Sequence, residues 1–378
     1  MKITDIKTTL IGAPLGQQFL AGTYRKATTK DTIITRVYTD TDITGVSFVG
    51  DVPELGRSII DSIQQQLKKD VLGEHLFSVE KIWNKLFLKH AMSNQRVMMQ
   101  AISHIDCAIW DGIGKACNQP VYRLLGNGGY QEKVPLISLG GYYTPGKEKP
   151  EQGREIIQKE ILAFKKQGMG GIKFKVGRLE VLEDIERVKI AREIAGDDFI
   201  LAVDANRAWT TQQAIQFASL AEKFDLNLRW IEEPCHWYYQ VKGMRRVRAT
   251  TEIPICAGQS EITRWGCHNL MEQEAIDVCN ADTSYCGGIT EWMKIANIAS
   301  AFDVEMAHHE EYQIAMHLFA AIPHGTYAEC FADPNVGPLY PHILRNRKVE
   351  DGFIFLPTTP GLGLDLNEEF IDKHTYTT

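Results

Sequence analysis

Residues 171–233 contain three short apolar runs, GIKFKVG (171–177), FILAVD (199–204) and LRWIEE (228–233), and these runs decide the fold. Each has a length typical of a strand that is buried on both faces. Each contains or ends near a charged residue: Lys175, Asp204 and Glu232. The runs recur at intervals of about 30 residues, which is the length of a βαβ unit. The stretch predicts successive β/α units, each with a polar side chain at the end of its strand.

The pattern continues on both sides of this stretch, with helical segments between the apolar runs. Five more runs bring the expected strands to eight: 134–140, 253–258, 275–280, 304–308 and 326–331. Gln259, Asp282 and His309 continue the series of polar residues, which are spaced by 23 to 29 residues. Such a series predicts an α/β fold with a (β/α)7β, TIM-like barrel, whose active site lies at the carboxyl ends of the strands.

The two flanks of the barrel have a different pattern. Residues 1–50 alternate β-branched and polar residues, and residues 54–125 have helical periodicity. We therefore expect an N-terminal α+β capping domain at 1–130, the catalytic barrel at 131–345, and a C-terminal segment at 346–378 that returns to the capping domain.

Composition limits the function. The 378 residues carry a net charge of −7, which argues against nucleic acid as a main partner. The eight cysteines form no CxxC pair and read as reduced, buried thiols of a cytoplasmic protein. No leader-like segment and no run of 18 apolar residues is present, so we expect no membrane association.

Lys173 and Lys175 lie two apart in the second strand, so both side chains point to the same side. If that side is the barrel interior, burial and a like-charged neighbour lower a lysine pKa and favour a general base. Taken alone, the pair fits two solvent-facing lysines better. Their register with the other polar residues favours the catalytic interpretation.

Oxygen ligands for a hard cation follow the next strands. Asp204 and Glu232 end neighbouring strands and are able to share Mg²⁺, although an acid in this position also commonly caps a helix. The third ligand is open. Gln259 stands where a further acid is expected and brings no charge, while Glu261, two residues on, is the alternative carboxylate.

Asp282 and His309 follow the next two strands. An aspartate beside a histidine fixes its tautomer and raises its pKa, which makes an acid/base pair. His308 is one register step away and is easily confused with its neighbour, and either of Glu310 and Glu311 is a candidate for a solvated charge. Glu329, on the eighth strand, completes the set.

The ordered set of motifs resembles the enolase superfamily, mandelate racemase subgroup. It comprises ISHIDCAIWDGIGKACNQPVYRLLG (102–126), GIKFKVG, VDAN (203–206), WIEEP (230–234), the Asp282 strand with Gly287 and Gly288, and the late histidine and glutamate. The resemblance implies that Lys175 is the base on one face of the substrate, tuned by Lys173. It implies that Asp204, Glu232 and Gln259 hold Mg²⁺.

The same resemblance gives roles to the remaining residues. Asp282 and His309 serve the opposite face, and Glu329 assists an enolate oxygen. The family's capping loops place substrate-selecting residues near Tyr24, Arg25 and Asp51. The other candidates for contact with the substrate are Tyr143, Asn206 and His308. Gln259 departs from the family's usual glutamate, which lowers the expected metal affinity.

The implied reaction is removal of the proton α to the carboxylate of an acid sugar, followed by loss of a β-oxygen. That step describes a sugar acid dehydratase, or a cycloisomerase that opens a 3,6-anhydro sugar acid. Alternatives are a racemase or epimerase of a 2-hydroxy acid, a lysine Schiff-base aldolase on the same fold, and a ligand-binding homologue without turnover. The family also implies a homo-oligomer, from dimer to octamer.

Overall fold

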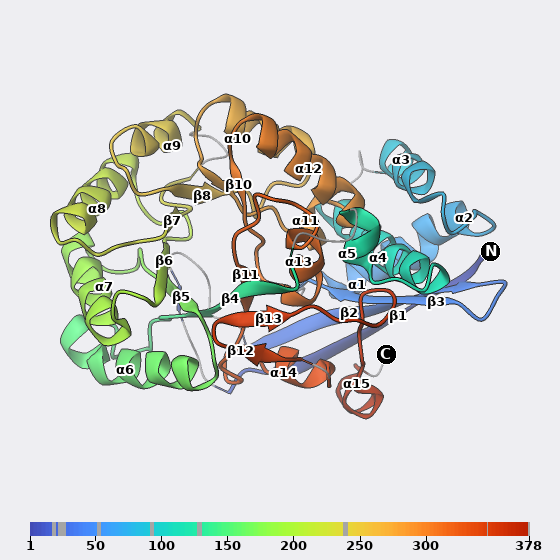
Figure 1. The fold of residues 1–378 in the computed structure, drawn as a ribbon, viewed down its shortest axis with the longest axis horizontal. Helices are drawn as coiled ribbons and strands as arrows, with labels where there is room; N and C mark the ends of the chain where they lie inside the picture. The colour runs from blue at the N-terminus through green and yellow to red at the C-terminus, as the bar shows by residue number, and fades with distance from the viewer. Residues whose placement is uncertain are drawn as a thin grey trace.

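The computed structural model describes residues 1–16, 20–21, 28–50, 54–90, 94–126, 131–236, 241–345 and 347–376. A three-stranded sheet covered by helices stands beside a closed barrel (Figure 1). Within the described ranges, every helix is too short or too polar to cross a membrane. The predicted class, a barrel with an N-terminal cap, is confirmed.

The cap begins with an antiparallel sheet in which β2 lies between its neighbours. Its strands are β1 (Ile3–Pro14), β2 (Thr29–Thr39) and β3 (Thr44–Val49). Its helices are α1 (Gly56–Asp61), the π-helical turn η1 (Ser62–Leu67), α2 (Lys68–Val71), α3 (Val79–His90), α4 (Gln95–Ala116) and α5 (Val121–Leu125). The long helix α4 crosses β3 at Gly45, where a Cβ atom would stand 2.0 Å from the carbonyl oxygen of Ala108. Glycine is therefore required for this close packing.

Eight parallel strands form the barrel in the described part of the chain, at the eight places that the apolar runs predict. They are β4 (Lys133–Gly140), β5 (Gly171–Lys175), β6 (Ile200–Asp204), β7 (Ile231–Glu232), β8 (Ile255–Ala257), β9 (Val278–Cys279), β10 (Glu305–Met306) and β11 (Ala328–Cys330). Neighbours in sequence pair from β4 to β10, and β11 pairs with β4. A bridge between Met306 and Gly325 closes the ring.

Helices connect the strands and form the outer layer (Figure 1). They are α6 (Pro150–Lys166), α7 (Val181–Ala195), α8 (Thr211–Lys223), α9 (Val241–Arg248), α10 (Arg264–Glu272), α11 (Thr283–Cys286), α12 (Ile289–Ala301) and α13 (Tyr312–Phe319). Their apolar faces pack on the outside of the sheet and make the main core. This arrangement leaves the barrel interior to a separate set of side chains.

The barrel interior has an apolar layer and a polar layer. Six buried side chains from six strands or their flanks form the apolar layer: Ile137, Ala202, Trp230, Cys256, Val278 and Ala307. Toward the carboxyl ends of the strands, the inward side chains become charged, beginning with the fully buried Lys173. Because charge in an interior is costly unless it is paired, this change marks the functional end of the barrel.

The tail follows two routes. Its first part adds β12 (Val349–Glu350) and β13 (Phe353–Phe355) to the barrel, where β13 pairs antiparallel with β4. Its second part, with α15 (Glu368–His374), lies on the cap, where Arg36 pairs with Glu368 at 2.7 Å. We expected the whole of 346–378 to return to the cap. The pairing of β13 with β4 is a contact across more than 200 residues of sequence, which local pattern does not reveal.

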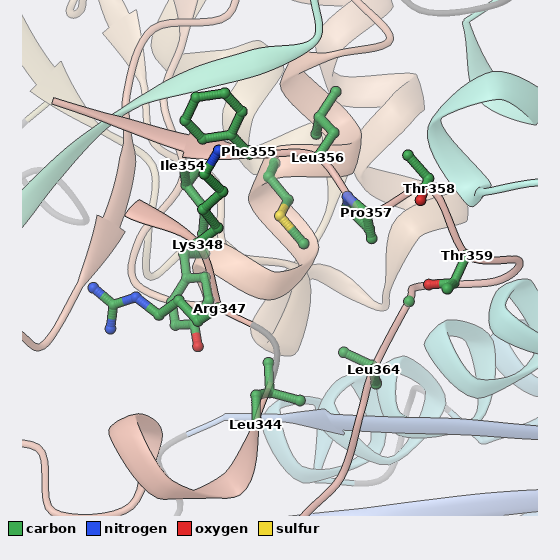
Figure 2. Close-up of a pocket in the computed structure, with 13 residues that line it drawn as sticks. Leu344, Arg347, Lys348, Ile354, Phe355, Leu356, Pro357, Thr358, Thr359 and Leu364 are labelled. Atoms are coloured by element: carbon green, nitrogen blue, oxygen red, sulfur yellow. The ribbon is translucent and has the colours of Figure 1, made fainter. Parts of the chain in front are cut away.

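The tail also encloses a pocket of about 240 Å³ against α13. Figure 2 shows Arg347, Phe355 and Thr359 around it, and α14 (Tyr340–Ile343) precedes this segment. Its described lining includes none of the residues predicted from the sequence to bind metal or substrate or to transfer protons. The pocket is therefore separate from the candidate active site.

Candidate active site

The two lysines of β5 both point into the barrel. Lys173 is fully buried and Lys175 is 5% exposed, so neither is a solvent-facing lysine. Lys173 Nζ donates to Glu232 Oε1 at 2.9 Å and to Glu329 Oε2 at 2.8 Å. Lys175 Nζ donates to Asp204 Oδ2 at 2.5 Å. The structure thus brings these five predicted residues into one group, held by buried ion pairs.

Charge balance distinguishes Lys173 from its neighbour. Burial by itself lowers the pKa of Lys173, but Glu232, Glu329 and Asp204 together raise it well above its usual value. Lys173 therefore remains an ammonium group. A permanently charged lysine is suited to hold the neighbouring carboxylates in place and to contribute positive charge to the site. It is not suited to act as a general base, because a base must be uncharged to accept a proton.

The oxygen donors lie on three neighbouring strands. Asp204 on β6 is in register with Glu232 on β7, which is in register with Cys256 on β8. Gln259 follows β8 and is 3% exposed, and its side-chain Oε1 accepts from Asn280 Nδ2 at 3.3 Å. These donors, two carboxylates and one amide, have the chemistry that suits a hard divalent cation. Each of the two carboxylates is paired with a lysine, Glu232 with Lys173 and Asp204 with Lys175. Both carboxylates therefore already bind positive charge.

Glu261, the alternative third ligand, is directed elsewhere. A Cβ atom at Gly266 would collide with its Oε2, so the carboxylate lies against the first turn of α10. The structure does not place Glu261 with the group at the ends of β6 and β7. Geometry therefore favours Gln259.

Asp282 and His309 form the expected pair. His309 Nδ1 lies 2.8 Å from Asp282 Oδ2, while Asp282 Oδ1 accepts from the backbone N–H and hydroxyl of Ser284 at 2.7 and 2.6 Å. Asp282 is also the N-cap of α11, so one carboxylate both caps this helix and pairs with His309. The two bonds from Ser284 orient the carboxylate toward His309.

The expected rise in the pKa of His309 is wrong. Burial lowers the pKa of His309 to about 4, and this exceeds the opposing effect of nearby carboxylates such as Glu310. The ring is therefore neutral near pH 7. With Nδ1 directed at Asp282, its Nε2 carries the lone pair and lies 3.7 Å from Glu310 Oε1.

Among the buried oxygens at this end that lack hydrogen-bond partners in the described residues are Asn206 Oδ1 and Glu329 Oε1. The other polar atoms of the same side chains are bonded, since Asn206 Nδ2 donates to Asp204 Oδ2 at 3.0 Å and Glu329 Oε2 accepts from Glu310 N at 3.1 Å. Buried polar atoms are normally satisfied, so these two indicate a place for a polar ligand.

Other predicted contact residues lie elsewhere. His308 directs Nε2 to the backbone N–H of Thr283 at 3.2 Å and Nδ1 to backbone carbonyls, so its ring bonds within the protein. Tyr143 bonds to Asp184 at 2.5 Å. Tyr24, Arg25 and Asp51 lie outside the described residues.

Comparison with known proteins identifies the family. A model described as enolase C-terminal domain-like matches residues 157–370. A model of the mandelate racemase / muconate lactonizing enzyme N-terminal domain matches residues 17–126. The chain belongs to the mandelate racemase/muconate lactonizing enzyme family.

Relatives in this family are similar along most of the chain. An arabinonate dehydratase of Saccharolobus solfataricus is 31% identical over 320 residues, 83% of this chain and 82% of that protein. A 3,6-anhydro-alpha-L-galactonate cycloisomerase of Streptomyces coelicolor is 30% identical over 372 residues, 98% of this chain and 99% of that protein. A solved family member from a marine actinobacterium, in complex with magnesium, is 38% identical, with a TM-score of 0.89 over 100% of this chain and 99% of that one. These relatives place the chain among enzymes.

The present chain also has residues at the site that were not predicted from its sequence. Lys175 Nζ lies 5.6 Å from the ring centre of Tyr142, the neighbour of the predicted Tyr143. Glu310 and Glu311, the candidates for a solvated charge, are 9% and 2% exposed. Glu233 is fully buried, and its pKa rises to about 8 because of burial and the charge of Asp204. The alternation of inward and outward side chains along β4 is the sequence signal that would indicate Tyr142. This alternation stops one residue past the end of β4.

Proposed function

We propose that the chain is a Mg²⁺-dependent enzyme that removes the proton α to the carboxylate of an acid sugar and then eliminates the β-oxygen. The observation that supports this most is the arrangement of two proton-transfer groups around one set of carboxylates. Lys175 comes from β5, and the Asp282–His309 pair comes from the ends of β9 and β10. The strands that carry the oxygen donors, β6 to β8, lie between them in the sheet.

We assign the metal ligands to Asp204, Glu232 and Gln259. Their oxygens come from consecutive strands, and Glu261 lies against α10. A bound Mg²⁺ supplies Lewis-acid stabilisation of negative charge on the substrate carboxylate. With Gln259 in place of a third carboxylate, the ligands carry two negative charges, which weakens metal binding.

The residues of the chain then divide the proton transfers. We assign removal of the α-proton on one face to Lys175. His309 serves the other face, where its proton assists departure of the β-oxygen. Loss of water gives a 2-keto-3-deoxy acid, and departure of an internal ether oxygen opens a ring. Asn206 Oδ1 and Glu329 Oε1 accept hydrogen bonds from the substrate, since both are buried and available.

One observation favours a second reaction on the same site. His309 is neutral in the free chain, because burial lowers its pKa to about 4, so its Nε2 presents a lone pair and not a proton. A base on each face gives 1,1-proton transfer, which is racemisation or epimerisation of a 2-hydroxy acid. Elimination instead requires His309 to be protonated when the substrate is bound. The product therefore distinguishes the two reactions.

The test is a panel of acid sugars incubated with the chain and Mg²⁺ in deuterium oxide. NMR follows exchange at the α-carbon, and a colorimetric assay follows 2-keto-3-deoxy acids. We expect exchange and keto product with at least one sugar acid. Exchange with inversion and no keto product would replace elimination by epimerisation. Neither signal with any member would contradict the proposal for these substrates.

Two controls separate the remaining classes. EDTA abolishes turnover by the proposed mechanism, whereas a Schiff-base aldolase is metal-independent and is trapped by borohydride on a lysine. A binding protein without turnover gains little thermal stability from Mg²⁺. An Asp282→Asn variant keeps the side-chain shape but loses the charge that holds His309. We expect it to lose keto product by about 10²-fold or more while α-exchange continues.

We also propose that the enzyme is cytoplasmic and assembles as a homo-oligomer. All eight cysteines are free thiols, and seven of them are buried, which fits a reducing compartment. The oligomer follows from the family resemblance. Light scattering on the purified chain tests it, and a mass of 42.6 kDa would contradict it.

A further inference from the structure

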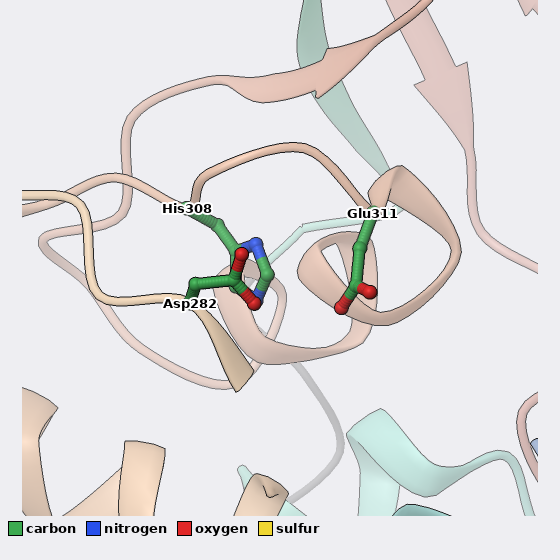
Figure 3. A group of neighbouring side chains, drawn as sticks. All are labelled: Asp282, His308 and Glu311. Carbon is green, nitrogen blue, oxygen red and sulfur yellow. The ribbon is translucent and has the colours of Figure 1, made fainter. Parts of the chain in front are cut away.

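Glu311 occupies an unusual position beside the proton-transfer pair. It is the N-cap of α13, two residues after His309, and it is 2% exposed. Figure 3 shows its carboxylate directed toward Asp282 and His308. Its backbone also forms a parallel bridge with Glu329. A buried acid at this point requires partners, and those partners come from both domains.

The two oxygens of Glu311 bind segments that are far apart in sequence. Oε1 accepts a close hydrogen bond from the backbone N–H of Gly50, which directly follows β3 of the cap. Oε2 accepts from the hydroxyl of Thr283 at 3.0 Å. Thr283 is the residue after Asp282. One carboxyl group therefore joins the end of the capping sheet to the loop that carries the catalytic aspartate.

The connection continues to His309 through its neighbour. His308 Nε2 accepts from Thr283 N at 3.2 Å, and its Nδ1 contacts the carbonyl oxygens of His309 and Glu310 at 2.9 and 3.2 Å. The loop after β10 is thus bonded to the loop after β9. The distance from Asp282 to His309 is set by the relative position of these two loops.

A metal ion is the competing explanation for this cluster. One ligand atom from each of Asp282, His308 and Glu311 lies within 4.8 Å of the others. Each side chain already has protein partners: Ser284 and His309 for Asp282, Thr283 for His308, and Gly50 and Thr283 for Glu311. A cation here would have to displace several of these bonds. The cluster is explained better as a hydrogen-bond network.

Backbone conformation shows that this loop is held under strain. Glu310 and Glu311 are consecutive non-glycine residues in the left-handed region, with φ of 54° and 51°. Such residues cost about 1–3 kcal/mol each and persist where the surroundings enforce them, often at functional sites. Burial and the charge of Asp282 also raise the pKa of Glu311 well above its usual value. The chain therefore keeps a costly side chain in a strained conformation at this junction.

From these contacts we infer that Glu311 is a positioning residue, which couples the end of the capping sheet to the geometry of the Asp282–His309 pair. The inference rests on the proposed function for its catalytic consequence, but the positioning itself is a property of the free chain. Loss of the Glu311 carboxyl group removes the hydrogen bonds to both Gly50 and Thr283. The end of the capping sheet and the loop after β9 are then no longer joined through this side chain.

The experiment compares Glu311→Ala with Glu311→Gln and with a matched control. Gln keeps an acceptor for Gly50, and its amide nitrogen donates to the Thr283 hydroxyl, which then accepts instead of donating, so the same two segments stay joined. The control is Gln313→Ala. Gln313 Nε2 donates to Phe48 O at 3.1 Å, so this variant removes a bond across the same cap–barrel junction without touching the network. Thermal unfolding of all variants first establishes that they are folded.

Two readouts separate positioning from general stability. The first is the ¹⁵N chemical shift of the His309 ring, assigned with His309→Gln, which reports the bond to Asp282 without substrate. The second is the ratio of keto product to α-exchange. We expect Glu311→Ala to change the ring shift and to lower this ratio about tenfold. Glu311→Gln and Gln313→Ala should stay within about threefold of the unmodified chain.

The outcomes are distinguishable. An unchanged His309 shift in Glu311→Ala overturns the inference, as does an equal change in Gln313→Ala. If the unmodified chain gives neither exchange nor product, the proposed function fails, while the ring shift still decides the positioning. If turnover is present and Glu311→Ala alters only the melting temperature, Glu311 is merely structural and the inference is wrong.

Discussion

Asp106 of the capping helix α4 caps a helix of the barrel. Its Oδ2 accepts from the backbone N–H of Thr290 at 3.0 Å and its Oδ1 accepts from the Thr290 hydroxyl at 2.6 Å. Thr290 lies in the first turn of α12, where backbone N–H groups have no partner within the helix. The same helix α4 also binds the loop after Asp282, because the Ser103 hydroxyl donates to Thr283 O at 2.7 Å. The cap thus holds the segment that carries Asp282.

Removing this contact should destabilise the junction. Asp106→Ala leaves the Thr290 N–H buried without an acceptor, which costs about 1–3 kcal/mol. Urea unfolding measures the loss. The control is Glu80→Ala, which breaks an exposed ion pair with Lys294 across the same junction. We expect the control to cost less than about 1 kcal/mol. Equal losses in the two variants would show that Asp106 acts only as a surface charge.

Metal affinity should respond to the charge at position 259. Gln259→Glu adds a third carboxylate to Asp204 and Glu232, so Mg²⁺ binding should tighten about tenfold, since affinity follows ligand charge. Gln259→Ala should weaken it. Isothermal titration calorimetry measures both.

Glu261→Ala is the matched control for the third ligand. Its carboxylate lies against α10, so Mg²⁺ binding should stay unchanged. A loss of affinity in Glu261→Ala, with none in Gln259→Ala, would reverse the ligand assignment.

The buried Glu233 should make stability depend on pH in a specific direction. Its pKa is about 8 in the folded chain, against 4.5 for an ordinary glutamate. Between these values the folded chain holds a proton that the unfolded chain has released, so this group's contribution to stability improves as the pH falls from about 8 to about 4.5. Above pH 8 the folded chain must carry a buried charge whose oxygens have no hydrogen-bond partner in the described residues, although Arg207 Nε lies 3.5 Å from Glu233 Oε2 as an ion-pair partner.

Glu233→Gln removes this ionisation. In EDTA at pH 9, we expect the variant to be more stable than the unmodified chain by about 1–3 kcal/mol. The difference should shrink toward pH 5, where the glutamate is protonated. Urea unfolding at the two pH values gives the comparison, and a difference that is constant or grows toward acid would contradict the predicted direction.

The barrel could be predicted because its signal is local and repeated. Each strand is a short apolar run with a polar residue at its end, so Lys175, Asp204 and Glu232 stand out in the sequence. Register then places them together, because parallel strands bring their carboxyl ends to one rim. The same logic located Asp282 and His309 correctly as a pair.

The remaining features depend on contacts between distant segments. The burial of Glu311 could not be predicted, because its partner Gly50 lies 261 residues away in the sequence. Tyr142 was not predicted, because strand β4 ends at Gly140 and side-chain alternation does not extend beyond it. The pKa of His309 was predicted in the wrong direction because the degree of burial is not visible in sequence.

Substitution of Lys175 is the sharpest test of its proposed role as the base that removes the α-proton. Lys175→Ala eliminates the amine that contacts Asp204 Oδ2 at 2.5 Å, while Lys189→Ala, which breaks a surface ion pair, serves as the control. With a responsive acid sugar, Mg²⁺ and deuterium oxide, NMR measures exchange at the α-carbon. We predict that Lys175→Ala lowers the exchange rate by about 10²–10⁴-fold and that Lys189→Ala leaves it unchanged. Exchange at the unmodified rate in folded Lys175→Ala would show that another group removes the α-proton.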